Sequence, residues 1–190
     1  MKQIKVIVAE DEPVTRRDIC EMLAEAKIKV IGECGDGQTA VELARRLKPD
    51  LILMDIKMPV MNGIEAARLL NEEKIAPVML LTAYSQKQLV DEAREAGVLA
   101  YLVKPITKQN LIPACHIAVA RYEEFSLLAQ EVDSLNDALA ARKQIEKAKG
   151  ILQQLYHIDE EAAFKKIRTM SMEQRKTMKE IADAIIIALG

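Results

Sequence analysis

Acidic, hydroxyl and basic side chains stand at the ends of the apolar segments in the first half of the sequence. Glu10 and Asp11 follow the first apolar segment, and Asp55 ends a later one. Thr82 ends a further segment, and Lys104 follows the last of them. If these segments are parallel strands of one sheet, their carboxyl ends meet along one edge. The sequence therefore predicts that the five side chains gather at a single site.

This combination of side chains suits phosphoryl transfer to a carboxylate. Carboxylates held close together repel one another, and a divalent cation relieves that repulsion. Oxygen ligands with room for water favour Mg²⁺ or Mn²⁺, and the set has no His or Cys to favour zinc. The Lys104 ammonium suits a phosphoryl oxygen, and Thr82 offers a hydroxyl donor. We therefore expect Asp55 to act as the nucleophile.

Strands and helices alternate through the first hundred residues. Strands are predicted at residues 3–9, 29–34, 50–55, 77–82 and 98–103, with helices at 14–27, 38–47, 64–73 and 86–96. Five such repeats predict an α/β fold with a five-stranded, doubly wound parallel sheet. Ligands of such sheets bind beyond the carboxyl ends of the strands, where the candidate residues stand.

The rest of the chain is predicted to be helical. A helix over residues 108–155 would be about 70 Å long at ~1.5 Å per residue, and Pro113 is expected to bend it near its start. Apolar residues along this helix recur at alternating spacings of three and four, which is typical of a helix–helix seam: Phe125, Leu128, Val132, Leu135 and Leu139. Two shorter helices are predicted at 159–170 and 172–189, with Asp159 and Ser171 as N-caps.

Residues 1–120 resemble the receiver domain of two-component response regulators, which has a flavodoxin-like fold. The resemblance is carried by Glu10-Asp11, Asp55, Met58-Pro59, Asn62-Gly63, Thr82-Ala83 and Lys104-Pro105. It implies that a histidine kinase phosphorylates Asp55. It also implies an Mg²⁺ site made by Glu10, Asp11, Asp55 and the backbone carbonyl of Lys57.

The same resemblance implies how phosphorylation is sensed. Thr82 is expected to follow the phosphoryl group, and Tyr101 is expected to swing inward with it. The peptide between Lys104 and Pro105 is expected to be cis, a state that proline permits. Apart from the resemblance, the apolar spacing along the long helix predicts that the seam pairs two phosphorylated chains as a homodimer. Alternatively, these apolar side chains pack on the receiver domain.

Residues 135–189 resemble the ANTAR domain, the RNA-binding output domain of transcription antitermination regulators. The resemblance is carried by stretches that include Ala148-Lys149-Gly150-Ile151-Leu152, Glu161-Ala162-Ala163-Phe164 and Gln174-Arg175-Lys176. The sequence departs from the family at Gln153, where Met is usual, and at Gln174, where Asn is common. We thus expect a receiver at 1–120, a helical coiled-coil linker at 121–140 and a three-helix RNA-binding domain at 141–190.

The ANTAR resemblance implies that RNA stem-loops in nascent transcripts are the ligand, and that binding prevents a terminator hairpin from forming. Six basic side chains are the candidate RNA contacts: Arg142, Lys149, Lys165, Arg168, Arg175 and Lys176. Some of them could instead form ion pairs with Glu146, Glu160 or Glu161 of the same chain. A glycine inside a helix costs up to ~1 kcal/mol relative to alanine. We therefore expect another helix or the RNA backbone to approach Gly150 closely.

The amino-acid composition excludes several classes of protein. Residues 141–190 carry a net charge of +3, whereas residues 1–140 carry −5. Half of the 190 residues are apolar, which excludes a disordered chain. There is no apolar run long enough to span a membrane and no secretory signal. Three cysteines without metal-type spacing predict a reduced, cytoplasmic protein that does not act at a membrane.

Three alternatives fit parts of the sequence. A phosphatase with an Asp nucleophile usually needs an acid two residues later, where Lys57 stands, so we expect a signalling protein and not a classical enzyme. The tail could bind a protein partner, because its charge is modest and aromatic residues are few. It could also bind DNA through its last two helices, although the apolar run at 185–187 makes a poor recognition face. His116 and His157 are expected on helix surfaces.

Overall fold

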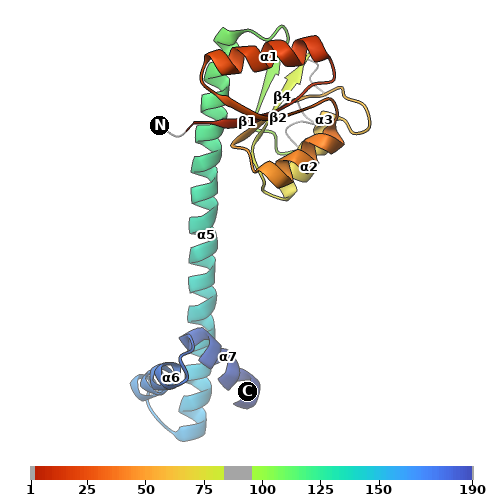
Figure 1. The fold of residues 1–190 in the computed structure, drawn as a ribbon. Helices are drawn as coiled ribbons and strands as arrows, with labels where there is room; N and C mark the ends of the chain where they lie inside the picture. Colours follow the sequence, from red (N-terminus) through yellow and green to blue (C-terminus); the bar gives the residue numbers. More distant parts are fainter. Residues whose placement is uncertain (1–2, 84–95, 190) are drawn as a thin grey trace. The chain divides into compact units, whose positions relative to one another are not determined.

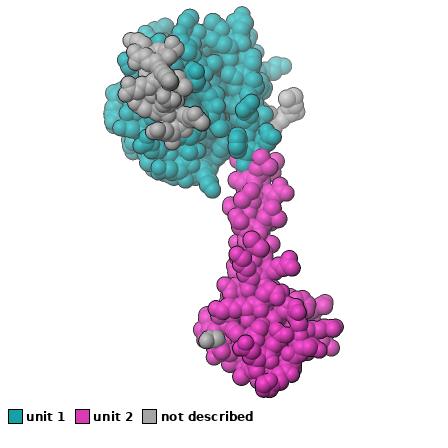
Figure 2. Space-filling model, turned by 180° about the vertical axis from the view of Figure 1, so that it is seen from behind, with its two compact units in different colours: residues 1–125 teal, residues 126–190 magenta. Residues whose placement is uncertain are grey.

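The structure is a computed structural model that describes residues 3–83 and 96–189. The chain divides into two compact units, Met1–Phe125 and Ser126–Gly190, which Figure 2 shows in different colours. No helix in the described part of the chain combines the length and the apolar character that crossing a membrane requires.

A five-stranded parallel sheet forms the centre of the first unit. Its strands are β1 (Lys5–Ala9), β2 (Lys29–Cys34), β3 (Leu51–Asp55), β4 (Val78–Thr82) and β5 (Ala100–Val103). They lie in the order β2-β1-β3-β4-β5, and every neighbouring pair is parallel. The predicted fold class is therefore confirmed, with four strands beginning one or two residues later than expected.

Helices cover both faces of this sheet. On one face lie α1 (Pro13–Glu25) and the beginning of α5 (Lys108–Tyr156), and on the other lie α2 (Gly37–Leu47) and α3 (Gly63–Glu72) (Figure 1). All five residues of β3 and all five of β4 are buried as a result. The helix predicted at 86–96 lies outside the described residues, except for its last position.

Alternate residues of β3 supply the two halves of the core. Ile52 and Met54 pack in the cluster beneath α2 and α3, together with Leu70. Leu51 and Leu53 belong to the opposite cluster, with side chains from α1 and α5. The two-residue period of a strand thus places apolar side chains on both faces, which is why the strand is continuously apolar in the sequence.

The second unit is a small three-helix core. The later part of α5 packs against α6 (Glu160–Gln174) and α7 (Met178–Leu189). The fully or almost fully buried side chains are Ala148, Leu152, Ala163, Ile167, Ile181, Ala182 and Ile185. Helix α5 continues through Pro113 without interruption, and the bend expected there stays a prediction.

The boundary between the last two helices differs from the sequence prediction. Asp159 is the N-cap of α6, as predicted, and it accepts a hydrogen bond from the Ala162 N–H at 2.7 Å. However, α6 continues to Gln174, so Ser171 lies inside the helix and the prediction of Ser171 as an N-cap is wrong. The turn begins instead at Arg175, which has a left-handed backbone with φ of 52°.

A capping box at the start of α7 explains this boundary. The Glu180 N–H donates to Thr177 Oγ1 at 3.2 Å, and the Thr177 N–H donates to Glu180 Oε2 at 2.7 Å. These reciprocal bonds satisfy backbone donors that the first helical turn leaves free. The hydrogen bonds to Thr177 also lower the pKa of the Glu180 carboxyl. The helix therefore starts where the sequence supplies a threonine and a glutamate three residues apart.

Replacing the capping threonine should destabilise the second unit. We expect Thr177→Ala to lower its free energy of unfolding by about 1 kcal/mol, because an N-cap and its reciprocal bond are lost. Thr169→Ala, at an exposed position within α6, is the matched control and should change stability by less than about 0.5 kcal/mol. Urea denaturation followed by circular dichroism measures both. Equal effects of the two substitutions would contradict the capping assignment.

The loop between β3 and α3 contains a residue in an unfavourable conformation. Val60 has φ of 66°, and its side chain is 87% exposed. A left-handed backbone costs roughly 1–2 kcal/mol for an L-residue, and a β-branched side chain is a marked outlier there. The loop therefore holds strain that no burial of Val60 offsets.

Relieving this strain should stabilise the first unit. We expect Val60→Asn to raise its free energy of unfolding by about 1 kcal/mol, because Asn tolerates the left-handed region. Val14→Asn is the control, since Val14 is also exposed but lies in helix α1. Thermal and urea denaturation of both variants test this. A rise for Val14→Asn, or none for Val60→Asn, would show that the loop is not strained.

Candidate functional site

Backbone hydrogen bonds align the carboxyl ends of the strands. The Glu10 N–H donates to the Cys34 carbonyl at 3.1 Å, directly beyond the last residue of β1. On the other side of the sheet, the Lys104 N–H donates to the Thr82 carbonyl at 2.7 Å. The residues that follow the strands are thus held at one edge, as the parallel topology requires.

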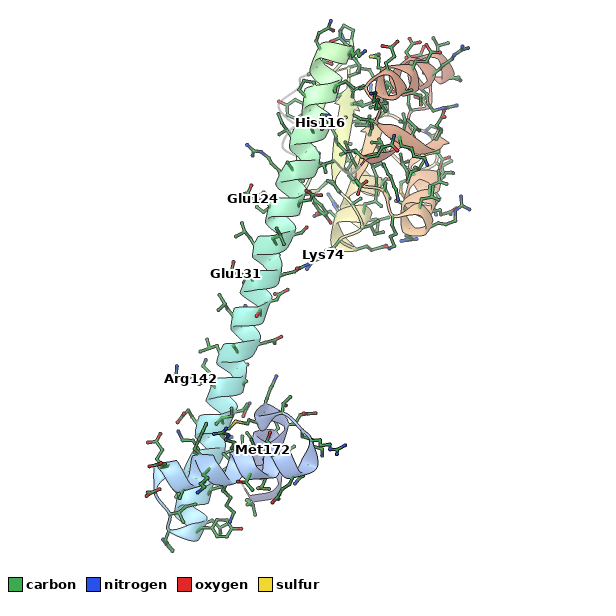
Figure 3. All side chains as sticks on the ribbon, turned by 60° about the vertical axis from the view of Figure 1, so that its left-hand side comes forward. Lys74, His116, Glu124, Glu131, Arg142 and Met172 are labelled. Carbon is green, nitrogen blue, oxygen red and sulfur yellow. The ribbon has the colours of Figure 1, made fainter. Side chains whose placement is uncertain are left out.

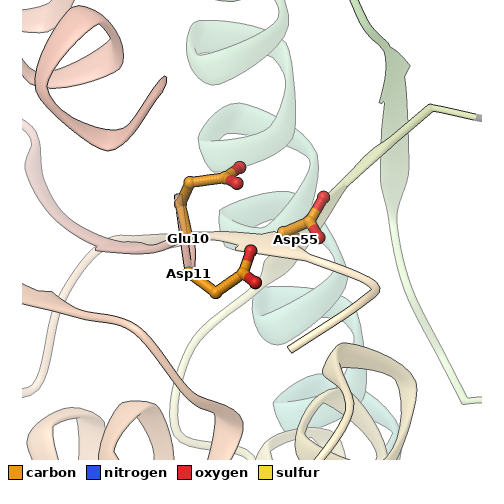
Figure 4. Close-up of side chains that lie close together, drawn as sticks. All are labelled: Glu10, Asp11 and Asp55. Atoms are coloured by element: carbon orange, nitrogen blue, oxygen red, sulfur yellow. The ribbon is translucent and has the colours of Figure 1, made fainter. Parts of the chain in front are cut away.

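Three carboxylates meet at this edge. One oxygen each of Glu10, Asp11 and Asp55 lies within 4.8 Å of the others, and Figure 4 shows the three side chains converging. Glu10 and Asp55 are buried, whereas Asp11 is exposed. A set of oxygen donors that is partly open to water fits Mg²⁺ or Mn²⁺. The Lys57 N–H donates to Asp55 Oδ2 at 2.9 Å, but the metal-binding role of its carbonyl stays a prediction.

The Lys104 ammonium joins two of these carboxylates. Its Nζ lies 2.8 Å from Glu10 Oε2 and 2.9 Å from Asp55 Oδ1. Burial lowers the pKa of Lys104, but the bonds and charges of both carboxylates outweigh it, so its pKa is raised overall. Burial also raises the pKa of Glu10, and Lys104 only partly opposes that effect. Lys104 therefore brings a full positive charge to the atoms around Asp55. Its peptide bond to Pro105 is cis, as the resemblance implied.

Gly63 lets the loop after Asp55 close tightly. A Cβ at this position would lie 2.1 Å from the Asp55 carbonyl oxygen, so no other residue fits without a backbone shift. The Gly63 N–H donates to the Ile56 carbonyl at 2.9 Å. Asn62 caps α3 by accepting a hydrogen bond from the Glu65 N–H at 2.9 Å. The Asn62-Gly63 pair thus sets the position of the loop that carries Asp55.

Thr82 and Tyr101 lie on the two neighbouring strands β4 and β5. Thr82 is buried at the end of β4. Tyr101 pairs with Leu80 and is 46% exposed. This exposed position is the starting point that an inward movement of the ring would need, and that movement itself remains a prediction.

Arg16 supports the site, and sequence reasoning missed it. From helix α1, its Nη1 donates to the Glu10 carbonyl at 2.5 Å and lies 3.5 Å from the Cys34 carbonyl. The guanidinium also lies 3.9 Å from Glu33. It therefore fixes the backbone from which Glu10 and Asp11 project. An arginine that follows an acidic pair on a helix has no special spacing, so the sequence gives no signal for this role.

Removing Arg16 should weaken metal binding. We expect Arg16→Met to lower Mg²⁺ affinity about tenfold, since groups that orient metal ligands typically contribute 10–100-fold. Arg17→Met is the control, because Arg17 is 80% exposed and its ion pair is with Glu21, one turn along α1. Calorimetric titration with Mg²⁺ measures the affinity, and a thermal melt checks the fold. Wild-type affinity in Arg16→Met would refute the role.

The predicted RNA contacts in the second unit do not all face solvent. Lys149 is 6% exposed, and its Nζ lies 2.9 Å from Glu146 and 2.6 Å from Glu160. Hydrogen bonds to these carboxylates raise its pKa. The Lys149 ammonium thus joins α5 to the start of α6, and its role as an RNA contact stays a prediction.

The other candidate RNA contacts are exposed. Arg142 lies on α5 ahead of the part covered by the other two helices (Figure 3), Lys165 and Arg168 lie on α6, and Arg175 and Lys176 follow it. Their exposure is compatible with contact to a polyanion, and their role in RNA binding stays a prediction. His116 and His157 are both exposed. His116 lies on α5 as expected, whereas His157 follows the end of this helix and has a left-handed backbone with φ of 54°.

The predicted seam is also exposed. Between 53% and 63% of each side chain stays accessible for Phe125, Leu128, Val132, Leu135 and Leu139. Five large apolar residues on one helix are thus left uncovered in the single chain. Such a stripe marks an interaction surface more often than scattered exposed residues do.

The close approach expected at Gly150 is not made by another helix of this chain. A Cβ at Gly150 would meet no atom within 4 Å. An intramolecular explanation for this glycine is therefore wrong.

The cysteines are free, and burial raises the pKa of Cys20 and Cys34 to about 11 and that of Cys115 to about 12, so their thiols are poor nucleophiles.

A doubly wound sheet that gathers three carboxylates and a lysine at one edge defines a receiver-type signalling domain. Comparison with protein families agrees: the response regulator receiver domain matches residues 6–116, and the ANTAR domain matches residues 133–186. The chain therefore belongs to the response regulators that join a receiver domain to an ANTAR domain.

Relatives support this assignment over different lengths. The transcriptional regulatory protein PdtaR of Mycobacterium tuberculosis is 48% identical over 186 residues, which is 98% of this chain and 91% of the relative. Protein CcdB of Bacillus subtilis is 40% identical over 111 residues, which is 58% of this chain and 92% of that protein.

Solved receiver domains superpose on the first part of the chain. The NarL receiver of Mycobacterium tuberculosis has a TM-score of 0.61 at 27% identity, covering 63% of this chain and 98% of its own. The receiver of the Pseudomonas aeruginosa sensor kinase PA1611 has a TM-score of 0.57 at 28% identity, covering 63% and 99%. That structure contains a magnesium ion coordinated in its active site cleft.

Proposed function

We propose that this protein is switched by phosphorylation of Asp55 by a histidine kinase and then binds RNA stem-loops in nascent transcripts to cause antitermination. The observation that carries the proposal is the Lys104 ammonium bridging Glu10 and Asp55, in a chain that also has an ANTAR domain. The first feature suits acceptance of a phosphoryl group, and the second supplies the output. This function implies a cytoplasmic protein.

In the proposed reaction, a carboxylate oxygen of Asp55 attacks the phosphorus of a phosphohistidine. The P–N bond breaks, the imidazole keeps its electron pair, and an acyl phosphate forms on Asp55. Lys104 Nζ, 2.9 Å from Asp55 Oδ1, lies beside the group that would carry the phosphoryl oxygens. Mg²⁺ held by Glu10, Asp11, Asp55 and the Lys57 carbonyl would add charge neutralisation, as the magnesium in the PA1611 receiver suggests.

Phosphorylation would draw Lys104 toward the new oxygens and weaken its bond to Glu10. Thr82, buried at the end of the adjacent strand β4, would turn its hydroxyl toward the phosphoryl group. Tyr101, half exposed on β5, would move inward into the space that this leaves. The surface of the receiver around β5 is thereby changed.

The change in the receiver surface would allow the seams on α5 of two chains to pair, so that a dimer forms. Phe125 to Leu139 span only about two heptads, fewer than the three or four that a stable coiled coil needs. A weak seam suits pairing that depends on phosphorylation. Two paired chains would present two ANTAR domains to one transcript, and linked sites raise the overall affinity without new contacts.

Beryllofluoride with Mg²⁺, which mimics a phosphoryl group on Asp55, tests the switch. We expect it to raise the affinity for a pool of RNA stem-loops at least about tenfold and to produce dimers in sedimentation, because avidity adds to each single contact. Asp55→Asn should abolish both changes and keep the fold. Asp18→Asn, the same substitution at an exposed position on α1, is the control and should still respond.

Two results would contradict the proposal. RNA affinity and sedimentation that do not change with beryllofluoride, while the metal site is occupied, would exclude a phosphorylation switch. No salt-dependent RNA binding in either state would favour a protein partner, since contacts to phosphates always weaken as salt rises. Tighter binding of a matching DNA pool would favour the DNA alternative.

A further inference from the structure

One face of α5 in the second unit is exposed and positively charged. Lys143, Lys147, Gly150 and Gln154 recur at spacings of four, three and four, which places them on the same side of a helix. We call this the lysine face. Ala148 and Leu152 are buried on the opposite side, against α6 and α7. The three side chains of the lysine face are exposed, and Gly150 is partly exposed.

The nearby acid does not neutralise the positive charge of the two lysines, because it is bonded to another lysine. Glu146 stands one residue before Lys147, but its carboxylate is bonded to Lys149 at 2.9 Å. Lys149 holds Glu160 as well, at 2.6 Å. Among the described residues, neither Lys143 nor Lys147 has a carboxylate within ion-pair distance. The buried Lys149 pairing thus leaves a net positive face beside it.

At Gly150, no side chain covers the backbone of this face. Nothing lies within 4 Å of where its Cβ would be, so alanine would fit and would favour the helix. The chain gives up that stability without using the space for its own packing. A ligand that comes close to the helix backbone is the physical explanation left on this side of α5.

The positive charge of the lysine face distinguishes between two ligands, a second copy of the helix and a polyanion. Leu139 and Gly150 are eleven residues apart, about three turns at 3.6 residues per turn, so the lysine face continues the side on which the apolar seam lies. If two seams pair in register, the second copy brings its own Lys143 and Lys147 to the same place, and like charges repel. A second helix therefore fits poorly beyond Leu139, whereas a polyanion fits well.

We propose that the lysine face is where the RNA phosphate backbone lies, crossing α5 at Gly150 between Lys147 and Gln154. This inference rests on the proposed RNA-binding function and assigns it to a defined surface. The lysines contribute phosphate contacts that do not depend on sequence. The absence of a side chain at Gly150 lets the backbone approach the helix.

Opposite effects on stability and on binding test the proposal. In the full chain, we expect Gly150→Ala to raise Tm of the second unit by roughly 4 °C, because helix propensity improves. The same variant should bind stem-loops with a constant stem and a randomised loop several-fold more weakly in the presence of beryllofluoride. Gly150→Leu should reduce binding further, by at least about tenfold, while remaining folded.

Charge variants supply an independent readout. Lys143→Gln and Lys147→Gln should each reduce the slope of log affinity against log salt by about 0.7–1, as expected for one lost phosphate contact. Lys179→Gln, at an exposed position on α7, is the matched control and should leave the slope unchanged.

The outcomes separate this inference from the function on which it rests. Wild-type RNA binding that Gly150→Ala and Gly150→Leu leave unchanged overturns the lysine face alone. Variants that lose dimerisation in sedimentation without RNA overturn it in favour of a second copy of the chain. A wild-type protein that binds no stem-loop in either state overturns the proposed function itself.

Discussion

Clustered negative charge at the edge of a parallel sheet is the constraint on which the first unit depends. The topology brings Glu10 and Asp55 to the same edge and buries both. Buried charges cost several kcal/mol each unless they are paired. Lys104 meets this need from the last strand by bonding to both carboxylates. These ion pairs offset the free-energy cost of burying the carboxylates, and they also place a cation beside the proposed nucleophile. One interaction therefore serves both the stability of the fold and the proposed phosphoryl transfer.

The second unit depends on a different balance. Its core consists of small and aliphatic side chains from three helices, so each helix has a wide polar surface. Lys149 neutralises two carboxylates where α5 meets α6. That pairing stabilises the junction and leaves neighbouring lysines unneutralised. Gly150 costs helix stability, although a Cβ there would meet no atom within 4 Å, and this is consistent with a surface shaped for a partner and not for the fold.

The sequence predicted the sheet and its site well because both follow from strong, local signals. Apolar strands followed by Glu10, Asp55 or Lys104 leave little choice of topology or edge. It failed where the outcome depends on side-chain geometry: Ser171 was a plausible cap, but the Thr177–Glu180 box forms a better one. The sequence allowed ion pairs between the basic side chains and Glu146 or Glu160, but spacing alone does not show that Lys149 is the residue that makes them. The support that Arg16 gives to Glu10 was likewise invisible before folding.

The proposed switch requires that Asp55 accepts a phosphoryl group in a site completed by Lys104. The most direct test is to treat the full chain with a small-molecule phosphodonor and Mg²⁺, reduce the product with borohydride, and map the modified residue by mass spectrometry. We expect conversion of Asp55 to homoserine, and loss of that signal when Mg²⁺ is omitted. A stable acyl phosphate at another carboxylate, or none in a protein shown to bind Mg²⁺, would contradict it.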